Sequence, residues 1–241
     1  GLDLTSLNGT NGFQLNGVDS WDNSGGSVSY AGDVNGDGID DIIIGAYDAS
    51  ADGKFEAGES YVVFGKSSGW AADLDLSSLN GSNGFRLDGV YANDNSGASV
   101  SSAGDVNGDG YGDIIIGAPL ADSGGKSDIG EIYVVFGQGI GFSSSLDLSS
   151  LDGSNGFRLD GVDAGDKTGL HISYAGDVNG DGYDDIIIGV PLADPNGQTS
   201  SGASYVVFGK SSGWSSGLDL TSLNGTNGFQ LNGVDSWDNS G

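Results

Sequence analysis

The stretch Gly104–Ala118, GDVNGDGYGDIIIGA, decides the fold of this 241-residue chain. A glycine-rich loop with carboxylate and amide side chains leads directly into three isoleucines. Closely similar stretches occupy residues 32–46 and 176–190, so the same junction occurs three times at a spacing of 72 residues. An oxygen-rich loop at the start of a continuous apolar strand predicts a hard cation held against the edge of a sheet.

The 72-residue spacing extends over the whole chain. The phrase Leu-Asp-Leu-(Ser/Thr)-Ser-Leu begins at Leu2, Leu74, Leu146 and Leu218, and Tyr-Val-Val-Phe-Gly begins at Tyr61, Tyr133 and Tyr205. Residues 217–241 are identical to residues 1–25. A period of this length indicates a repeat architecture, with units at 1–73, 74–145 and 146–217 and a partial unit at 218–241.

Each unit reads as four strands. In the second unit, residues 84–90 alternate apolar and polar, 98–103 are small, and 114–118 and 131–136 are apolar runs bounded by turn residues. No segment has helical periodicity, although Leu-(Ser/Thr)-Ser-Leu is compatible with one short turn. We therefore predict an all-β chain of tandem four-stranded antiparallel propeller-type blades, with the small strand nearest the axis. An open stack of blades assembled between chains is the alternative.

The end segments bear on how such blades associate. The C-terminal copy, residues 218–241, is expected to supply the outer strand of the third blade. The identical N-terminal segment is then left to pair elsewhere, for example with a second chain, because an unpaired strand edge promotes association.

Composition restricts the partners. Seven basic and 34 acidic residues give a net charge of −27, which repels nucleic acid and anionic membranes and attracts cations. No apolar run reaches the length of a membrane span, so no membrane insertion is expected. The chain has no cysteine and one histidine, His171, and it lacks a Gly-x-Ser-x-Gly motif. These absences leave little for nucleophilic catalysis, and we expect a protein that is not an enzyme.

The loop has the pattern Asp-x-Asn-x-Asp-Gly-x-x-Asp, with side-chain oxygens at positions 1, 3, 5 and 9 and a backbone carbonyl at position 7. Ca²⁺ takes six to eight oxygen ligands, whereas Mg²⁺ requires strict octahedral geometry and retains water. An EF-hand needs glutamate at position 12, where this chain has Ile44, Ile116 and Ile188. The alternative interpretation is that Asp, Asn and Gly form hairpin turns here without binding metal.

Taken with the flanking Ser-Gly-Ala-Ser-Val, Ile-Ile-Ile-Gly-Ala-Pro and Tyr-Val-Val-Phe-Gly, the pattern resembles the FG-GAP repeat, the blade of the integrin α-subunit head and of many large bacterial surface proteins. The resemblance covers essentially the whole chain and implies a β-propeller, usually of seven blades, with Ca²⁺ between the first two strands of a blade. Three units do not fill seven positions, and Gly-Ala-Pro is intact only at residues 117–119.

The resemblance implies three calcium sites, each with a backbone carbonyl at its fourth position. The ligand sets are Asp33, Asn35, Asp37, Ile39 and Asp41; Asp105, Asn107, Asp109, Tyr111 and Asp113; and Asp177, Asn179, Asp181, Tyr183 and Asp185.

The expected function is that of a calcium-binding extracellular structural or adhesion repeat protein of a bacterial cell surface. Calcium would rigidify the blades and promote self-association through the end segments into a surface layer, filament or sheath. The alternative is a propeller module that binds a protein or glycan through the variable loops at 47–59 and 119–127. A second acidic cluster, Asp48, Asp52, Glu56 and Glu59, is a weaker candidate ion site, and tryptophans near turns are expected to pack between blades.

Overall fold

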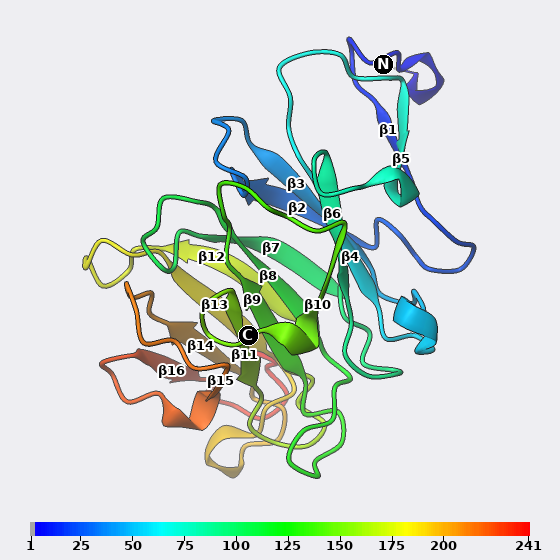
Figure 1. The fold of residues 1–241 in the computed structure, drawn as a ribbon. Helices are drawn as coiled ribbons and strands as arrows, with labels where there is room; N and C mark the ends of the chain where they lie inside the picture. The colour runs from blue at the N-terminus through cyan, green and yellow to red at the C-terminus, as the bar shows by residue number, and fades with distance from the viewer. Residues whose placement is uncertain (1–2) are drawn as a thin grey trace.

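The structure, a computed structural model, describes residues 3–241 and consists of short strands and single-turn helices (Figure 1). The strands are β1 (Gln14–Asn16), β2 (Ser27–Gly32), β3 (Asp41–Ala46), β4 (Glu59–Val63), β5 (Asp73–Asp75), β6 (Gly84–Asp88), β7 (Ser99–Gly104), β8 (Asp113–Ala118), β9 (Glu131–Val135), β10 (Ser145–Asp147), β11 (Gly156–Asp160), β12 (His171–Gly176), β13 (Asp185–Val190), β14 (Ala203–Val207), β15 (Gly217–Asp219) and β16 (Gly228–Asn232). The predicted all-β class is confirmed.

Short 3-10 helices interrupt the connections between strands. They are η1 (Leu4–Ser6), η2 (Ala51–Gly53), η3 (Leu76–Ser78), η4 (Leu148–Ser150), η5 (Pro195–Gly197) and η6 (Leu220–Ser222). Helices η1, η3, η4 and η6 lie where the Leu-(Ser/Thr)-Ser-Leu phrase predicts a short turn. None of the helices within residues 3–241 has the length and apolar character needed to cross a bilayer.

Three four-stranded antiparallel arrays follow one another along the chain, and we call them blades 1, 2 and 3. Blade 1 consists of β2, β3, β4 and β6, blade 2 of β7, β8, β9 and β11, and blade 3 of β12, β13, β14 and β16. The outer strand of each blade comes from the following 72-residue unit, since β6 pairs with β4 and places Phe85 opposite Val62. The C-terminal segment forms β16 and completes blade 3 in the same register, with Phe229 opposite Val206, as predicted.

A further short strand pairs in parallel with the outside of β6 and β11, the outer strands of blades 1 and 2, and with β1. β10 adds to β6 with Leu146 opposite Leu87, β15 adds to β11, and β5 adds to β1 with Leu74 opposite Leu15. β1 is therefore the counterpart of β6, but within residues 3–241 it has no antiparallel partner, whereas β6 pairs with β4. These strands have only three residues each, too few to show a periodicity in the sequence.

The inner strands of small residues run side by side, with β7 between β2 and β12. Glycine makes this close approach possible. The carbonyl oxygen of Gly97 in blade 2 occupies the space that a Cβ on Gly45 of blade 1 would need, and Gly169 stands in the same relation to Gly117. The small strands β2, β7 and β12 thus neighbour one another, and their place nearest a propeller axis stays a prediction.

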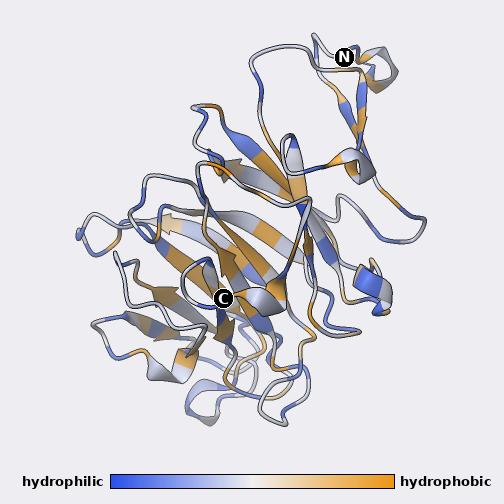
Figure 2. Cartoon of the chain, in the orientation of Figure 1, coloured by the Kyte–Doolittle hydropathy of each residue, from blue (hydrophilic) through white to orange (hydrophobic). Residues whose placement is uncertain are grey.

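Apolar side chains fill the joints between blades. Figure 2 shows that hydrophobic residues are concentrated on the strands. Ile43 and Leu87 of blade 1 share one core with Ile116 of blade 2, and Ile115 of blade 2 shares a second core with Ile188 of blade 3. A third core lies on blade 1 and is covered in part by the N-terminal segment. Burial of this kind is the main favourable term for repeats that cannot cover both of their faces alone.

Aromatic stacking marks each of the three cores. Phe13 stacks on Trp70 at 4.1 Å between ring centroids, Phe85 on Phe142 at 4.6 Å, and Phe157 on Trp214 at 4.2 Å. Such pairs add about 0.5–1.5 kcal/mol beyond the area they bury. The predicted packing between blades is confirmed for Trp214, which packs at the joint of blades 2 and 3. Trp70 instead packs between blade 1 and the N-terminal segment, and the prediction is wrong for Trp21 and Trp237, which are exposed.

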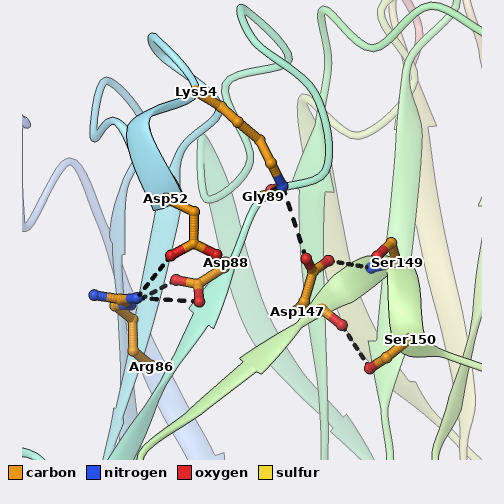
Figure 3. A network of polar contacts seen from close by, with 8 residues as sticks. All are labelled: Asp52, Lys54, Arg86, Asp88, Gly89, Asp147, Ser149 and Ser150. Atoms are coloured by element: carbon orange, nitrogen blue, oxygen red, sulfur yellow. Dashed lines mark hydrogen bonds and ion pairs between the residues drawn. The ribbon is translucent and has the colours of Figure 1, made fainter.

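Polar contacts connect consecutive units at the outer rim (Figure 3). Arg86 on β6 pairs with Asp88 on the same strand at 2.5 Å and with Asp52 in the β3–β4 connection at 3.8 Å. Lys54 Nζ donates to the carbonyl of Gly89 at 3.1 Å and lies 3.7 Å from Asp147 on β10. Each pair is partly solvated and adds little stability, but together they hold the register of the next unit.

Candidate metal centre

Each predicted metal loop connects the inner strand of a blade to its second strand, at residues 33–40, 105–112 and 177–184. Glycines at the fourth and sixth loop positions have left-handed backbone conformations, with φ of 71° at Gly36 and 85° at Gly38. Only glycine adopts this conformation at little cost. The two glycines therefore explain how so short a loop turns its side-chain oxygens inward.

Hydrogen bonds inside the loop bring the first ligand positions together. Asp33 Oδ1 accepts from the amide of Asp37 at 3.0 Å, and Asp33 Oδ2 accepts from the amide of Gly38 at 2.8 Å. Asn35 Oδ1 accepts from the same Asp37 amide at 2.9 Å. The oxygens of positions 1 and 3 consequently converge on one point, and the other two loops repeat the arrangement.

The ninth-position aspartates lie at the bottom of the loops. Asp41 is 1 % exposed, and its two carboxylate oxygens accept from the amides of Val34 and Gly65 at 2.9 and 2.7 Å. Burial raises the pKa of Asp41 to about 6 and that of Asp113 to about 8, against the lowering effect of these amides. Burial raises the pKa of Asp185 as well.

Negative charge in the loops is not balanced by protein cations. The ion pairs in the described part of the chain involve Lys and Arg of the rim, and none reaches a loop carboxylate. Asp37 and Asp33 each raise the pKa of Asp41 further by repulsion. A divalent cation at this place would remove that repulsion, and an all-oxygen donor set suits Ca²⁺.

The full ligand sets stay predictions. No group of three or more Asp, Glu, His or Cys side chains within residues 3–241 is gathered as a metal cage. The structure brings Asp33, Asn35 and Asp37 together and places Asp41 beneath them, with their oxygens bonded to loop amides. The loops therefore fit a cation in chemistry and position. The turn interpretation accounts for the hydrogen bonds but not for the unbalanced negative charge.

The loops of blades 1 and 2 are also held by the blade that follows each of them. The amide of Gly112 in the blade 2 loop donates to the carbonyl of Asp33 at 2.8 Å, and the amide of Gln138 donates to the carbonyl of Val34 at 3.0 Å. Asp184 and Lys210 of blade 3 bond Asp105 and Val106 in the same way. An ion in the loop would thus rigidify the joint between two blades as well as one blade.

The second acidic cluster does not form one site. Asp48 accepts hydrogen bonds from the side-chain amides of Asn23 and Asn95, and Asp52 pairs with Arg86. Glu59 is buried and accepts a hydrogen bond from Tyr61. Because these carboxylates have separate partners, the solvated-loop interpretation is favoured over an ion site.

A buried ionic network between β9 and β11 of blade 2 is not evident from the sequence pattern. Glu131, 1 % exposed, accepts from the Tyr133 hydroxyl at 2.5 Å and lies 3.4 Å from Arg158. Burial raises the pKa of Glu131, opposed by the Tyr133 bond and Arg158. Comparison of the units could have revealed the network, because its two charged residues are replaced together. Blade 3 has Ala203 at the position of Glu131 and Gln230 at the position of Arg158.

A hollow lies at the corresponding place in each blade. In blade 3 it measures about 380 Å³ and is lined by Asp163, Asp166, Asp194, Tyr205 and Gln230, among others. Burial and the neighbouring carboxylates raise the pKa of Asp166 to about 6. The hollows of blades 1 and 2, which Arg86 and Arg158 line, measure about 260 and 250 Å³, so that of blade 3 is the widest of these three.

Repeated blades with one oxygen-rich loop each define a propeller-type repeat protein. The FG-GAP repeat family matches three segments of the chain, residues 25–63, 96–135 and 173–207. The first two matches run from the turn before the inner strand through the loop to the third strand, and the last one begins within the inner strand β12. The chain belongs to the FG-GAP repeat family.

Curated relatives agree with this assignment. The chain is 32 % identical over 178 residues to phosphatidylinositol-glycan-specific phospholipase D of Mus musculus, covering 73 % of this chain and 19 % of that protein. It is 32 % identical over 195 residues to integrin alpha-5 of Xenopus laevis, covering 78 % and 16 %. For integrin alpha-PS5 of Drosophila melanogaster the identity is 29 % over 168 residues, covering 68 % and 14 %. The chain spans about a fifth or less of the length of these relatives.

Proposed function

We propose that the chain is a calcium-binding extracellular structural or adhesion module that performs no catalysis. One observation carries the proposal: three loops of the same sequence pattern each gather side-chain oxygens without a protein cation, and in blades 1 and 2 the next blade bonds to the loop backbone. Calcium in such loops would fix the angle between blades. The net charge of −27 and the relationship to integrin α chains support a place outside the cell, which we propose is a bacterial surface.

Self-assembly into a surface layer, filament or sheath is part of this proposal. The charge of each copy opposes association at low ionic strength, and bound Ca²⁺ would reduce that charge at the joints. Calcium is therefore expected to promote assembly as well as to stabilise single blades.

Isothermal titration with Ca²⁺ and thermal unfolding in Ca²⁺ or chelator test the proposal. Three bound ions are expected, and at 100 times Kd each site adds about 2.7 kcal/mol to the free energy of unfolding. Chelation should therefore lower the melting temperature sharply. Identical melting in millimolar Ca²⁺ and in chelator, with no heat of binding, would rule out the calcium role.

A second candidate function is recognition of a protein or glycan ligand. The hollow of about 380 Å³ in blade 3, which is wider than its counterparts of about 260 and 250 Å³ in blades 1 and 2, favours it. A glycan array probed at millimolar Ca²⁺ is the direct test. Binding that is lost in Tyr205→Ala and kept in Tyr133→Phe would support this function, and an array without signal would weigh against it.

A further inference from the structure

We propose that a second copy of the chain docks head to tail, with its blade 1 seated on the free face of blade 3. This joint would have the geometry of the two joints inside the chain. The inference deepens the proposed self-assembly and rests on it, since it names the surfaces and the segment that join the copies.

The free face of blade 3 repeats the residues that seat a following blade. Val178 is 52 % exposed, whereas its counterparts Val34 and Val106, which face the next blade, are 1 % and 2 % exposed. Leu231 on β16 is 53 % exposed, whereas Leu87 and Leu159 are fully buried. Blade 3 thus presents a seat with the same side chains and no occupant among residues 3–241.

The opposite face of blade 1 repeats the residues that are seated. Val28 on β2 is 66 % exposed, but its counterpart Val100 on β7 is 6 % exposed and belongs to the core between blades 1 and 2. Ile42 is half-buried, but Ile114 is fully buried in the same core. The two faces are therefore the two halves of one interface, and they are carried by opposite ends of the molecule.

Backbone groups match in the same way. At the internal joints the carbonyls of the first two loop residues accept from two amides of the next blade, for example Asp33 and Val34 from Gly112 and Gln138. In the same register, Asp177 and Val178 of blade 3 would accept from Asp40 and Lys66 of an incoming blade 1. Those two amides lie 72 residues before Gly112 and Gln138.

Only one of the two identical end segments fits at this joint. Residues 217–241 already occupy the place of residues 1–25 of a following unit: β16 makes a five-residue antiparallel ladder with β14, and Gly241 lies against Gly189 as Gly97 lies against Gly45. β1 makes only a three-residue parallel ladder with β5. The incoming copy therefore releases its own residues 3–25, and its β5 pairs with β16 in the register of β10 on β6.

Two single substitutions test the joint from opposite sides. Val28→Glu places a charge on the seated face and Leu231→Glu places one on the seat, so each should weaken association by roughly a hundredfold. Ile140→Glu is the matched control, since it adds the same charge at a site in the β9–β10 connection that is 90 % exposed and lies on neither end face. Thermal unfolding in Ca²⁺ verifies that each variant is folded.

The readout is the mass in solution by sedimentation at 1–200 µM chain in Ca²⁺ and in chelator, concentrations chosen to span about two orders of magnitude around a micromolar Kd. The wild type and Ile140→Glu should rise with concentration in multiples of 24.1 kDa. Val28→Glu and Leu231→Glu should each stay at one chain up to about 10 µM and should associate only at about a hundredfold higher concentration than the wild type. Their equimolar mixture should form dimers and nothing larger, because the pair retains one intact seat and one intact seated face.

The outcomes separate the joint from the calcium role. A wild type that binds three calcium ions but stays at 24.1 kDa overturns the joint and leaves the calcium role standing. Association that Val28→Glu blocks without any calcium binding keeps the joint and overturns the calcium role. Failure of the mixture to form dimers overturns the head-to-tail arrangement. If Leu231→Glu leaves association unchanged, β16 does not stay in blade 3 when the second copy docks. Such a result would mean that β1 of the incoming copy replaces β16.

Discussion

The ring of Tyr111, in the loop of blade 2, lies against Gly36 in the loop of blade 1, so that a Cβ on Gly36 would collide with the ring. Tyr183 of blade 3 lies against Gly108 of blade 2 in the same way. The glycine at the fourth loop position thus has two tasks, because it adopts a left-handed φ and admits an aromatic ring from the next blade. The candidate metal loops are for this reason part of the blade joints.

Gly180 allows these two tasks to be measured separately. It has φ of 77°, close to the 71° of Gly36, but no atom lies within 4 Å of the place of its Cβ. Gly180→Ala should therefore lower the free energy of unfolding by about 1 kcal/mol from backbone strain alone. Gly36→Ala should cost about 2–3 kcal/mol, because overpacking against Tyr111 is added.

Urea unfolding of both glycine variants, with and without Ca²⁺, supplies the comparison. Equal losses for Gly36→Ala and Gly180→Ala would show that the Tyr111 contact adds nothing to the joint.

Asp109→Asn separates the metal role of a loop from its turn role. The asparagine side chain keeps an oxygen that accepts the hydrogen bond from the backbone N–H of Tyr111, which measures 3.0 Å in the structure. The substitution removes the negative charge of the carboxylate. We expect calcium stoichiometry to fall from three to two, with stability in chelator within about 0.5 kcal/mol of the wild type. Calorimetric titration checks the first number and chemical unfolding the second.

Asp73→Asn, at an exposed position outside the loops, is the control for charge. If Asp109→Asn still leaves three equivalent sites, the loop is a turn and not a calcium site.

A buried carboxyl group between blades 1 and 2 makes stability depend on pH. Asp94 is 4 % exposed, and burial, with repulsion from Glu131 and Asp122, raises its pKa to about 6. The folded chain then holds this proton between about pH 4 and 6, where the unfolded chain has released it. Its contribution to stability is present below pH 4 and is lost as the pH rises through 6.

Asp94→Asn removes that dependence. The variant should be more stable than the wild type by about 1–2 kcal/mol above pH 6.5, and the difference should shrink toward zero near pH 4. Unfolding in urea across this pH range measures the difference. A variant that is less stable than the wild type at pH 7 would instead indicate that the Asp94 carboxylate is stabilised by a bound cation.

The buried ionic network offers a natural comparison inside the chain. Arg158→Gln leaves the Glu131 carboxylate buried without its cation and should lower the free energy of unfolding by about 2 kcal/mol, less than a fully buried pair because Arg158 is partly exposed. Glu131→Ala added to Arg158→Gln copies Ala203 and Gln230 of blade 3 and should restore most of the loss. A double variant as unstable as the sum of the two single changes would contradict this coupling.

Local features of this chain were open to prediction from its sequence. The strands at Ser99–Gly104 and Asp113–Ala118, the turn glycines and the oxygen positions of the loop depend on residues close to one another along the chain. The 72-residue period added the repeat and the expectation that β16 completes blade 3. Such features follow from backbone preference and alternation, which act over a few residues.

The choice of strand partners and the burial of charge were decided only by the tertiary structure. That β5, β10 and β15 pair in parallel outside the blades, that Glu131 is buried beside Arg158, and that Val28 and Leu231 stay exposed while their counterparts are buried all depend on which blade lies next to which. Identical residues have different surroundings at the ends and in the middle of a stack. The sequence repeats from unit to unit, but the packing around equivalent residues differs, because the two outer faces have no blade against them among residues 3–241.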